Sequence, residues 1–78
     1  MAEKFPAIRD GDVILVLKKL GFTLWRQTKG SHEVWRHADG RHTTVPRHRG
    51  RTIKRRTLKS IIVDLGLTVK EFNRLLRD

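Results

Sequence analysis

The hydrophobic pattern between Asp10 and Gly21 has the spacing of a helix. Apolar residues recur at positions 13, 16, 17 and 20, which places them on one helical face. We expect Asp10 to be the N-cap and Gly21 to end the helix, because carboxylates accept from free backbone N–H groups and glycine tolerates a left-handed C′ position. The unbroken apolar run 13–17 also suits a buried strand, but Lys18 and Lys19 are typical of a helix C-terminus.

After Gly21 the apolar residues alternate with polar ones, which is typical of half-buried strands. Three such segments follow one another, at 22–27, 33–37 and 42–45. The second and third flank Asp39-Gly40, a strong hairpin signal, so we expect three antiparallel strands.

A two-residue loop at Asp39-Gly40 would set the pairing of this hairpin. Continued to the strand ends, the pairing places His32 opposite Arg47 and Ser31 opposite His48. A bulge in the loop would instead shift the pairing by one residue and turn alternate side chains to the other face.

Two further helices are expected after the sheet. The first has apolar positions 58, 61, 62 and 65, with Thr57 as cap and Gly66 as stop. The second begins with a capping box from Thr68 to Glu71 and has apolar positions 69, 72, 75 and 76. The order is α-β-β-β-α plus a short C-terminal helix. Helices on one face of a three-stranded antiparallel sheet make a two-layer α+β domain.

Length and composition narrow the class of protein. A chain of 78 residues suits one domain, which we expect over residues 1–78, with 1–9 as a lead-in segment. The sequence has no cysteine, which excludes disulfides, thiolate metal sites and a cysteine nucleophile. His37 and His42, which a two-residue loop would place opposite each other, lack a third ligand, so we expect no metal and no cofactor. Without a signal-peptide pattern or a long apolar run, we expect a soluble, cytoplasmic protein that is not bound to a membrane.

Charge is the strongest bulk property. The chain has 18 Lys and Arg residues against 8 Asp and Glu residues, a net charge of +10. Residues 26–56 hold ten of these cations, two of the acids and all four histidines. Because such an excess is relieved by a polyanion, we expect nucleic acid as the partner. The simpler alternative is a solvated basic surface.

Two clusters in this segment combine fixed charge with histidine, Lys29-Gly30-Ser31-His32 and Val45-Pro46-Arg47-His48. Side by side in the sheet, they would form one phosphate-handling site. RNA supplies its own nucleophile, the 2′-hydroxyl, so the protein needs a proton-transfer group and cations. We expect His32 to be the general base or acid, and Lys29 and Arg47 to hold the phosphate. The structural alternative is that His32 caps a turn.

Other candidates also have two readings. His48 is either a second acid/base group or a support of the strand end, and Ser31 either bonds a phosphate oxygen or is a turn residue. Trp25 and Trp35 either stack on bases or cover the core, and Trp35 is the better stacking candidate if it points away from the face of Val34. The remaining expected RNA-binding residues are basic and contact phosphates: Arg36, Arg49, Arg51, Lys54, Arg55 and Arg56.

Four short motifs occur in order along the chain: Gly21-Phe22, Lys29-Gly30-Ser31-His32, Val45-Pro46-Arg47-His48 and Thr57-Leu58-Lys59-Ser60-Ile61. Together they resemble the HicA family of toxins, which are mRNA interferases of type II bacterial toxin–antitoxin pairs. The resemblance implies a fold like the double-stranded-RNA-binding domain, a catalytic histidine at His32, mRNA as substrate, and a HicB-type antitoxin that covers the active site. Relatives often have an acidic residue and a glycine where this chain has the basic stretch 51–56, a difference that bears on the antitoxin contact more than on the chemistry.

Two other functions remain open from the sequence. An RNA- or DNA-binding module without chemistry accounts for the charge and predicts a salt-dependent affinity for an intact nucleic acid. A regulatory protein whose basic face docks an acidic partner is the third possibility. The sequence leaves the oligomeric state undetermined.

Overall fold

The computed structural model describes residues 7–48 and 51–78, and within them six elements follow in the predicted order. They are α1 (Asp10–Leu20), β1 (Thr23–Gln27), β2 (His32–Arg36), β3 (His42–Pro46), α2 (Arg55–Asp64) and α3 (Val69–Arg77). The strands form one antiparallel sheet in the order β1-β2-β3. The predicted α+β fold, like that of the double-stranded-RNA-binding domain, is confirmed.

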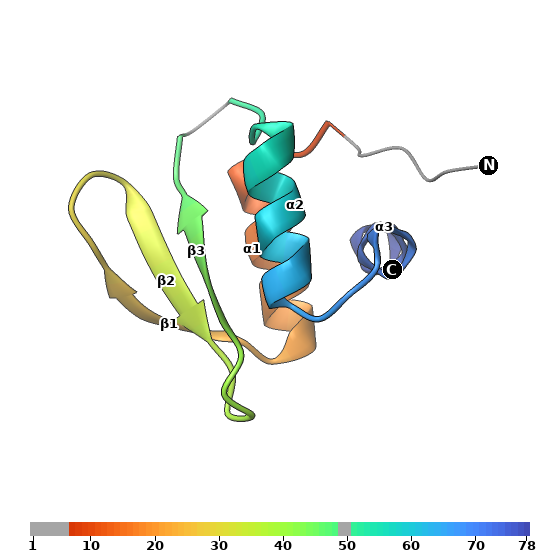
Figure 1. The fold of residues 1–78 in the computed structure, drawn as a ribbon, viewed down its shortest axis with the longest axis horizontal. Coiled ribbons are helices and arrows are strands. Elements are labelled where there is room, and N and C mark those ends of the chain that lie inside the picture. Colours follow the sequence, from red (N-terminus) through yellow and green to blue (C-terminus); the bar gives the residue numbers. More distant parts are fainter. Residues whose placement is uncertain (1–6, 49–50) are drawn as a thin grey trace.

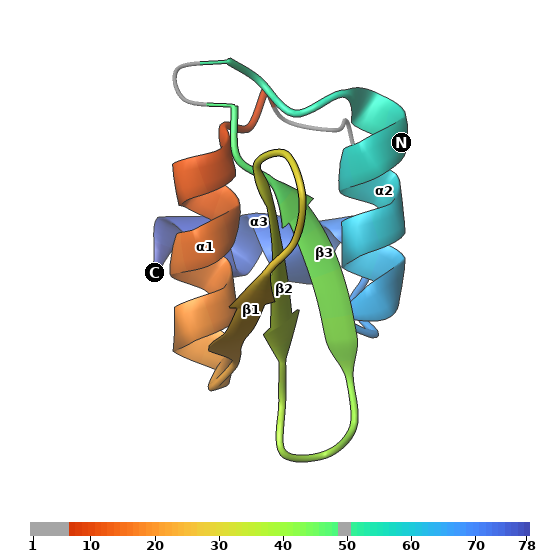
Figure 2. The ribbon, with the colours of Figure 1, turned by 90° about the vertical axis from the view of Figure 1, so that its left-hand side faces the viewer.

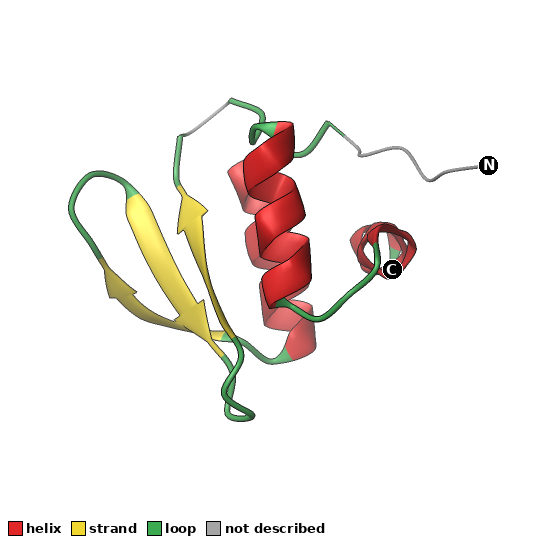
Figure 3. Cartoon of the chain, viewed as in Figure 1, coloured by secondary structure: helices red, strands yellow, loops and turns green. Residues whose placement is uncertain are grey.

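The helices all lie on one side of the sheet. Figure 1 shows α1 and α2 packed against one face, and Figure 2 shows α3 running across behind them. The other face, on the far side of the strands from the helices in Figure 3, is left open. We call it the outer face. None of the helices in the described part of the chain has the length and apolarity that a membrane span needs.

The core lies between the sheet and the helices. Trp35 and Val45 contribute to it from the strands, and Phe72 from α3. The predicted apolar face of α2 is buried as expected. The core residues from α1 and α2 are Val13, Ile14, Val16, Leu17, Leu58, Ile61 and Ile62. Because these helical faces cover one side of the sheet, side chains on the outer face are free for other contacts.

The helix starts differ from two predictions. Arg9, not Asp10, is the N-cap of α1, and its backbone N–H donates to Asp12 Oδ2 at 3.0 Å. Asp10 lies in the first turn instead, where its carboxylate accepts a hydrogen bond from Arg47, the residue after β3. α2 begins at Arg55, before the predicted cap Thr57, which lies inside the first turn. Arginine is a good helix former, so the helix extends back past the threonine.

The capping box of α3 is confirmed. The Glu71 backbone N–H donates to Thr68 Oγ1 at 3.1 Å, and the Thr68 N–H donates to Glu71 Oε1 at 2.8 Å. At the other end of the chain, residues 7–9 of the predicted lead-in are packed against the domain. Ile8 is buried, and its carbonyl oxygen accepts from the Ile53 N–H at 2.7 Å.

The β2–β3 loop holds three residues, 38–40, where two were predicted. The His37 N–H donates to the Arg41 carbonyl oxygen at 2.8 Å, and the Gly40 N–H donates to the His37 carbonyl oxygen at 3.0 Å. Gly40 has a φ of 99°, whereas Asp39 has a negative φ. A two-residue type I′ turn needs positive φ at both central positions, so this loop is a type I turn followed by a left-handed glycine.

Candidate functional site

The two histidine-containing clusters meet at one end of the sheet. The Thr28 N–H donates to the His32 carbonyl oxygen at 2.8 Å, which closes the β1–β2 loop over residues 29–31. Across the next pair of strands, the Arg47 N–H donates to the Ser31 carbonyl oxygen at 2.6 Å, and His32 pairs with Pro46. Figure 2 shows this loop at the same end of the molecule as the start of α2.

The pairing is one residue away from the predicted register, and this divides the clusters between two faces. Paired residues of antiparallel strands share a face, and successive residues alternate between faces. His32 therefore lies with Pro46 on the outer face, and Ser31 lies with Arg47 on the face toward the helices. The predicted pairs His32–Arg47 and Ser31–His48 are wrong, because the three-residue loop shifts the ladder.

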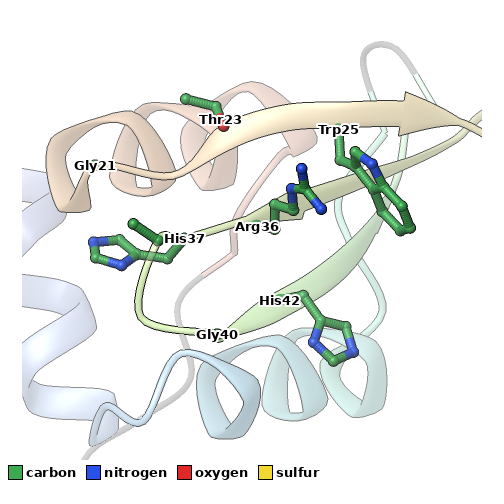
Figure 4. A pocket seen from close by; sticks show the side chains of 8 residues that line it. Gly21, Thr23, Trp25, Arg36, His37, Gly40 and His42 are labelled. Atoms are coloured by element: carbon green, nitrogen blue, oxygen red, sulfur yellow. The ribbon is translucent and has the colours of Figure 1, made fainter.

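The same shift separates the two remaining histidines. His42 pairs with Arg36, not with His37, and Figure 4 shows the two imidazoles directed away from each other. The His37 ring lies against Phe22 with centroids 5.2 Å apart, and its Nδ1 accepts from the Asp39 N–H at 3.0 Å. Within residues 7–48 and 51–78, no three His, Asp or Glu side chains gather into a metal site.

His32 is an exposed imidazole at the start of β2. Its Nδ1 lies 3.6 Å from where a Cβ on Gly30 would stand, so the ring sits beside the β1–β2 loop. No hydrogen bond joins the ring to another described residue. Lys29 in the same loop and His48 after β3 are exposed as well. The imidazole is therefore accessible to a ligand that approaches the outer face, with an exposed cation close by in the chain.

Arg47 is held inside the domain by two carboxylates. Its Nε donates to Asp10 Oδ2 at 2.7 Å and its Nη1 donates to Glu33 Oε1 at 2.9 Å. The same Glu33 oxygen accepts from the Trp35 indole N–H at 3.1 Å. The Arg47 side chain keeps 29% exposure, against 8% for Asp10. The structure thus gives no support to the expected phosphate contact of Arg47, because its charge is already neutralised between α1 and β2.

The hydrogen bond from Arg47 lowers the pKa of the buried Asp10 carboxyl below its ordinary value of 3.8, although burial acts in the opposite direction. A lowered folded-state pKa contributes stability that is complete above the unfolded pKa and is lost as the pH falls through the folded pKa. We therefore expect the urea concentration at the unfolding midpoint to decrease as the pH is lowered below about 4.

The variant Asp10→Asn should lose part of this acid dependence. The measurement is the urea midpoint by circular dichroism between pH 7 and 2, with each protein's midpoints expressed relative to its own value at pH 7. Asp78→Asn, at an exposed position beyond α3, should keep the wild-type profile. An unchanged acid profile in Asp10→Asn would show that the ion pair does not contribute to it.

The two tryptophans, for which the sequence left both roles open, differ in exposure. Trp35 does point away from the face of Val34, but that direction leads into the core, where Trp35 is 5% exposed. Its predicted stacking on RNA bases is therefore wrong. Trp25 on β1 is 50% exposed and carries the guanidinium groups of Arg26 and Arg36 at 4.8 Å from its ring centroid. No alternation in the sequence marks this exposure, because every residue of β1 is exposed and the pairing shifts at Trp25.

The other basic candidates are mostly at the end of the molecule that holds His32. Arg51, Lys54, Arg55 and Arg56 are exposed, at or just before the start of α2. Cations at a helix N-terminus are unfavourable because the helix dipole is positive there, and a bound anion would relieve this. Arg49 lies outside the described residues. Arg36 is exposed at the opposite end of β2.

A sequence model of the HicA toxin of bacterial toxin–antitoxin systems matches residues 11–67. The chain belongs to the HicA toxin family. The match runs from α1 to just beyond α2, so it contains the whole sheet and both histidine clusters. No curated protein matches the sequence. HicA proteins are ribonuclease-type toxins of toxin–antitoxin systems, and an antitoxin partner is therefore implied for this chain.

Proposed function

We propose that this HicA toxin is a metal-independent endoribonuclease that cleaves mRNA and so inhibits translation, with His32 as its proton-transfer group. The observation that supports this proposal is the exposed imidazole at the start of β2, without a hydrogen-bond partner among the described residues. A histidine that merely capped the turn would be bonded to the loop. An unbonded one can exchange a proton with a ligand, and imidazole titrates near neutral pH.

In this mechanism RNA provides the nucleophile. A base removes the proton of the 2′-hydroxyl, the oxygen attacks the neighbouring phosphorus, and the 5′-oxygen of the next nucleotide leaves with a proton from an acid. The products are a 2′,3′-cyclic phosphate and a 5′-hydroxyl. His32 acts as the base or as the acid, and His48, exposed after the strand that pairs with β2, is the candidate for the second group.

Cations hold the phosphate in this proposal. Lys29 lies in the loop that precedes His32, and the basic residues at the start of α2 are at the same end of the molecule (Figure 2). Such charges stabilise the negative charge that develops at phosphorus. Arg47 instead joins the end of β3 to α1 and β2, and Ser31 accepts its backbone N–H. A HicB-type antitoxin would inhibit the toxin by covering this end of the sheet.

The test is cleavage of a labelled RNA by the purified protein in excess chelator. We expect fragments that end in a 2′,3′-cyclic phosphate. A DNA oligonucleotide of the same sequence is the matched control, and it should stay intact because it lacks the 2′-hydroxyl. RNA that is bound but not cleaved under these conditions would favour the alternative function, a basic RNA- or DNA-binding module without chemistry.

A further inference from the structure

The outer face of the sheet has a second group of exposed polar and aromatic residues, at the end of β2 away from His32. Trp25, Arg36 and His42 line a hollow of about 620 Å³ together with residues of the β2–β3 connection and of the start of β1. Figure 4 shows the Arg36 and Trp25 side chains side by side, with His42 below them on the neighbouring strand. The three residues come from three different strands, so the sheet itself fixes their spacing.

An irregularity in β1 accounts for the position of Trp25. The pairing of β1 with β2 shifts between Leu24 and Arg26, so Trp25 lies outside the regular ladder. The Arg36 guanidinium is 4.8 Å from its ring centroid, and Arg36 lies on the same face as His32 because the two are four residues apart on one strand. The indole therefore lies on the outer face.

We propose that Trp25, Arg36 and His42 bind a nucleobase of the RNA on which His32 acts. This inference rests on the function proposed above. Indole and guanidinium planes are the surfaces on which unpaired RNA bases stack. Imidazole nitrogens donate to or accept from the edge of a base. The exposed indole is already covered in part by two guanidinium groups, and one of them can move to a phosphate when a base takes its place.

The distance along β2 supports one continuous RNA contact. His32 and Arg36 are four residues apart, which is about 13 Å along a strand. A single strand laid across the outer face thus reaches both the imidazole and the indole. In this arrangement the base at Trp25 sets which phosphodiester lies at His32. The subsite is therefore a determinant of the cleavage position, in addition to the affinity.

The experiment measures binding of a fluorescent single-stranded RNA oligonucleotide to a cleavage-deficient parent, His32→Ala, with further substitutions on the outer face. We expect Trp25→Ala to weaken binding by between about 5-fold and 150-fold, the range measured for loss of one base–aromatic stack. Trp25→Phe should retain most of the affinity. Leu24→Ala is the matched control, because Leu24 is 49% exposed on the same strand. Its affinity should equal that of the parent.

Two readouts separate stacking from charge and from folding. The salt dependence of the affinity should not change in Trp25→Ala, because no cation is lost. Quenching of tryptophan fluorescence by RNA should disappear in Trp25→Phe, since the remaining Trp35 is buried. If Trp25→Ala is unfolded by circular dichroism, Trp25→Leu keeps an apolar side chain and should show the same loss of affinity.

The outcomes distinguish the two proposals. A parent protein that does not bind RNA contradicts the proposed function as a whole. If folded Trp25→Ala or Trp25→Leu binds RNA with the same affinity as the parent, the nucleobase subsite is contradicted. The ribonuclease proposal is then unaffected. Equal weakening by Leu24→Ala would also contradict the subsite, because the effect would then belong to β1 in general.

Discussion

Replacement of His32 by alanine is expected to slow RNA cleavage by about 10²–10⁴-fold, the usual contribution of a positioned proton-transfer group. The affinity for RNA should stay close to that of the wild type, because cations that contact phosphates supply most of the affinity for nucleic acid and this variant keeps all of them. His32 is exposed, and its side chain has no hydrogen bond to a described residue, so its loss should leave the fold intact. Single-turnover cleavage and fluorescence anisotropy with one labelled RNA measure the two quantities.

A second substitution at the same position tests the chemistry further. His32→Gln keeps a polar side chain that can donate and accept hydrogen bonds, but it cannot exchange a proton near neutral pH. It should be as inactive as the alanine variant. If His32→Gln retained wild-type activity, the imidazole would serve as a hydrogen-bonding group and not as an acid or base.

His42→Ala is the matched control on the outer face. This histidine pairs with Arg36, away from the proposed reaction centre. Its removal should raise KM and leave kcat unchanged, which is the behaviour of a residue that only binds substrate. Cleavage that continues undiminished in His32→Ala, or a kcat that falls equally in both variants, would remove His32 from its special role.

Replacement of Arg47 by alanine is expected to destabilise the fold by about 2–4 kcal/mol, which lowers the melting temperature by about 8–30 °C in a domain of this size. Arg47 neutralises the buried Asp10 and the half-buried Glu33. Its loss would leave both carboxylates inside the domain without a cation. This loss of stability is smaller than the roughly 3–5 kcal/mol for removing one partner of a fully buried ion pair. The reason is that the Arg47 side chain is 29% exposed, so solvent screens part of the interaction.

Two controls for Arg47→Ala separate the loss of one arginine from the effect of leaving two carboxylates inside the domain without a cation. Arg56→Ala removes an exposed arginine outside this ion pair and should change the free energy of unfolding by less than about 0.5 kcal/mol. The triple variant Asp10→Asn, Glu33→Gln, Arg47→Met removes the carboxylates together with the cation and should be more stable than Arg47→Ala alone. Thermal unfolding followed by circular dichroism checks both, and an Arg47→Ala protein as stable as Arg56→Ala would contradict the proposed role.

The same variant decides what Arg47 does for the chemistry. If it only supports the fold, Arg47→Ala should cleave RNA at a near wild-type rate at temperatures where it is fully folded. A loss of cleavage in the folded variant would instead restore the phosphate contact that the sequence suggested.

Much of this architecture could be predicted from local sequence. The apolar faces of the helices, the three alternating segments and the capping box at Thr68 each depend on residues close together in the chain. The adjacency of the two histidine clusters also followed from the hairpin. These features are local, so spacing and turn chemistry were enough to indicate them.

Tertiary structure decided which side chains share a face. One additional residue in the 38–40 loop moved His32 away from Arg47, because side chains alternate along a strand. Asp10 does not cap α1, and its carboxylate binds Arg47, the residue after β3. Trp35 packs in the core, whereas Trp25 is exposed. The sequence by itself determined the elements and the basic, histidine-containing segment of this HicA protein. The register of the sheet and the packing of the helices on one face determined which of those residues lie exposed on the outer face.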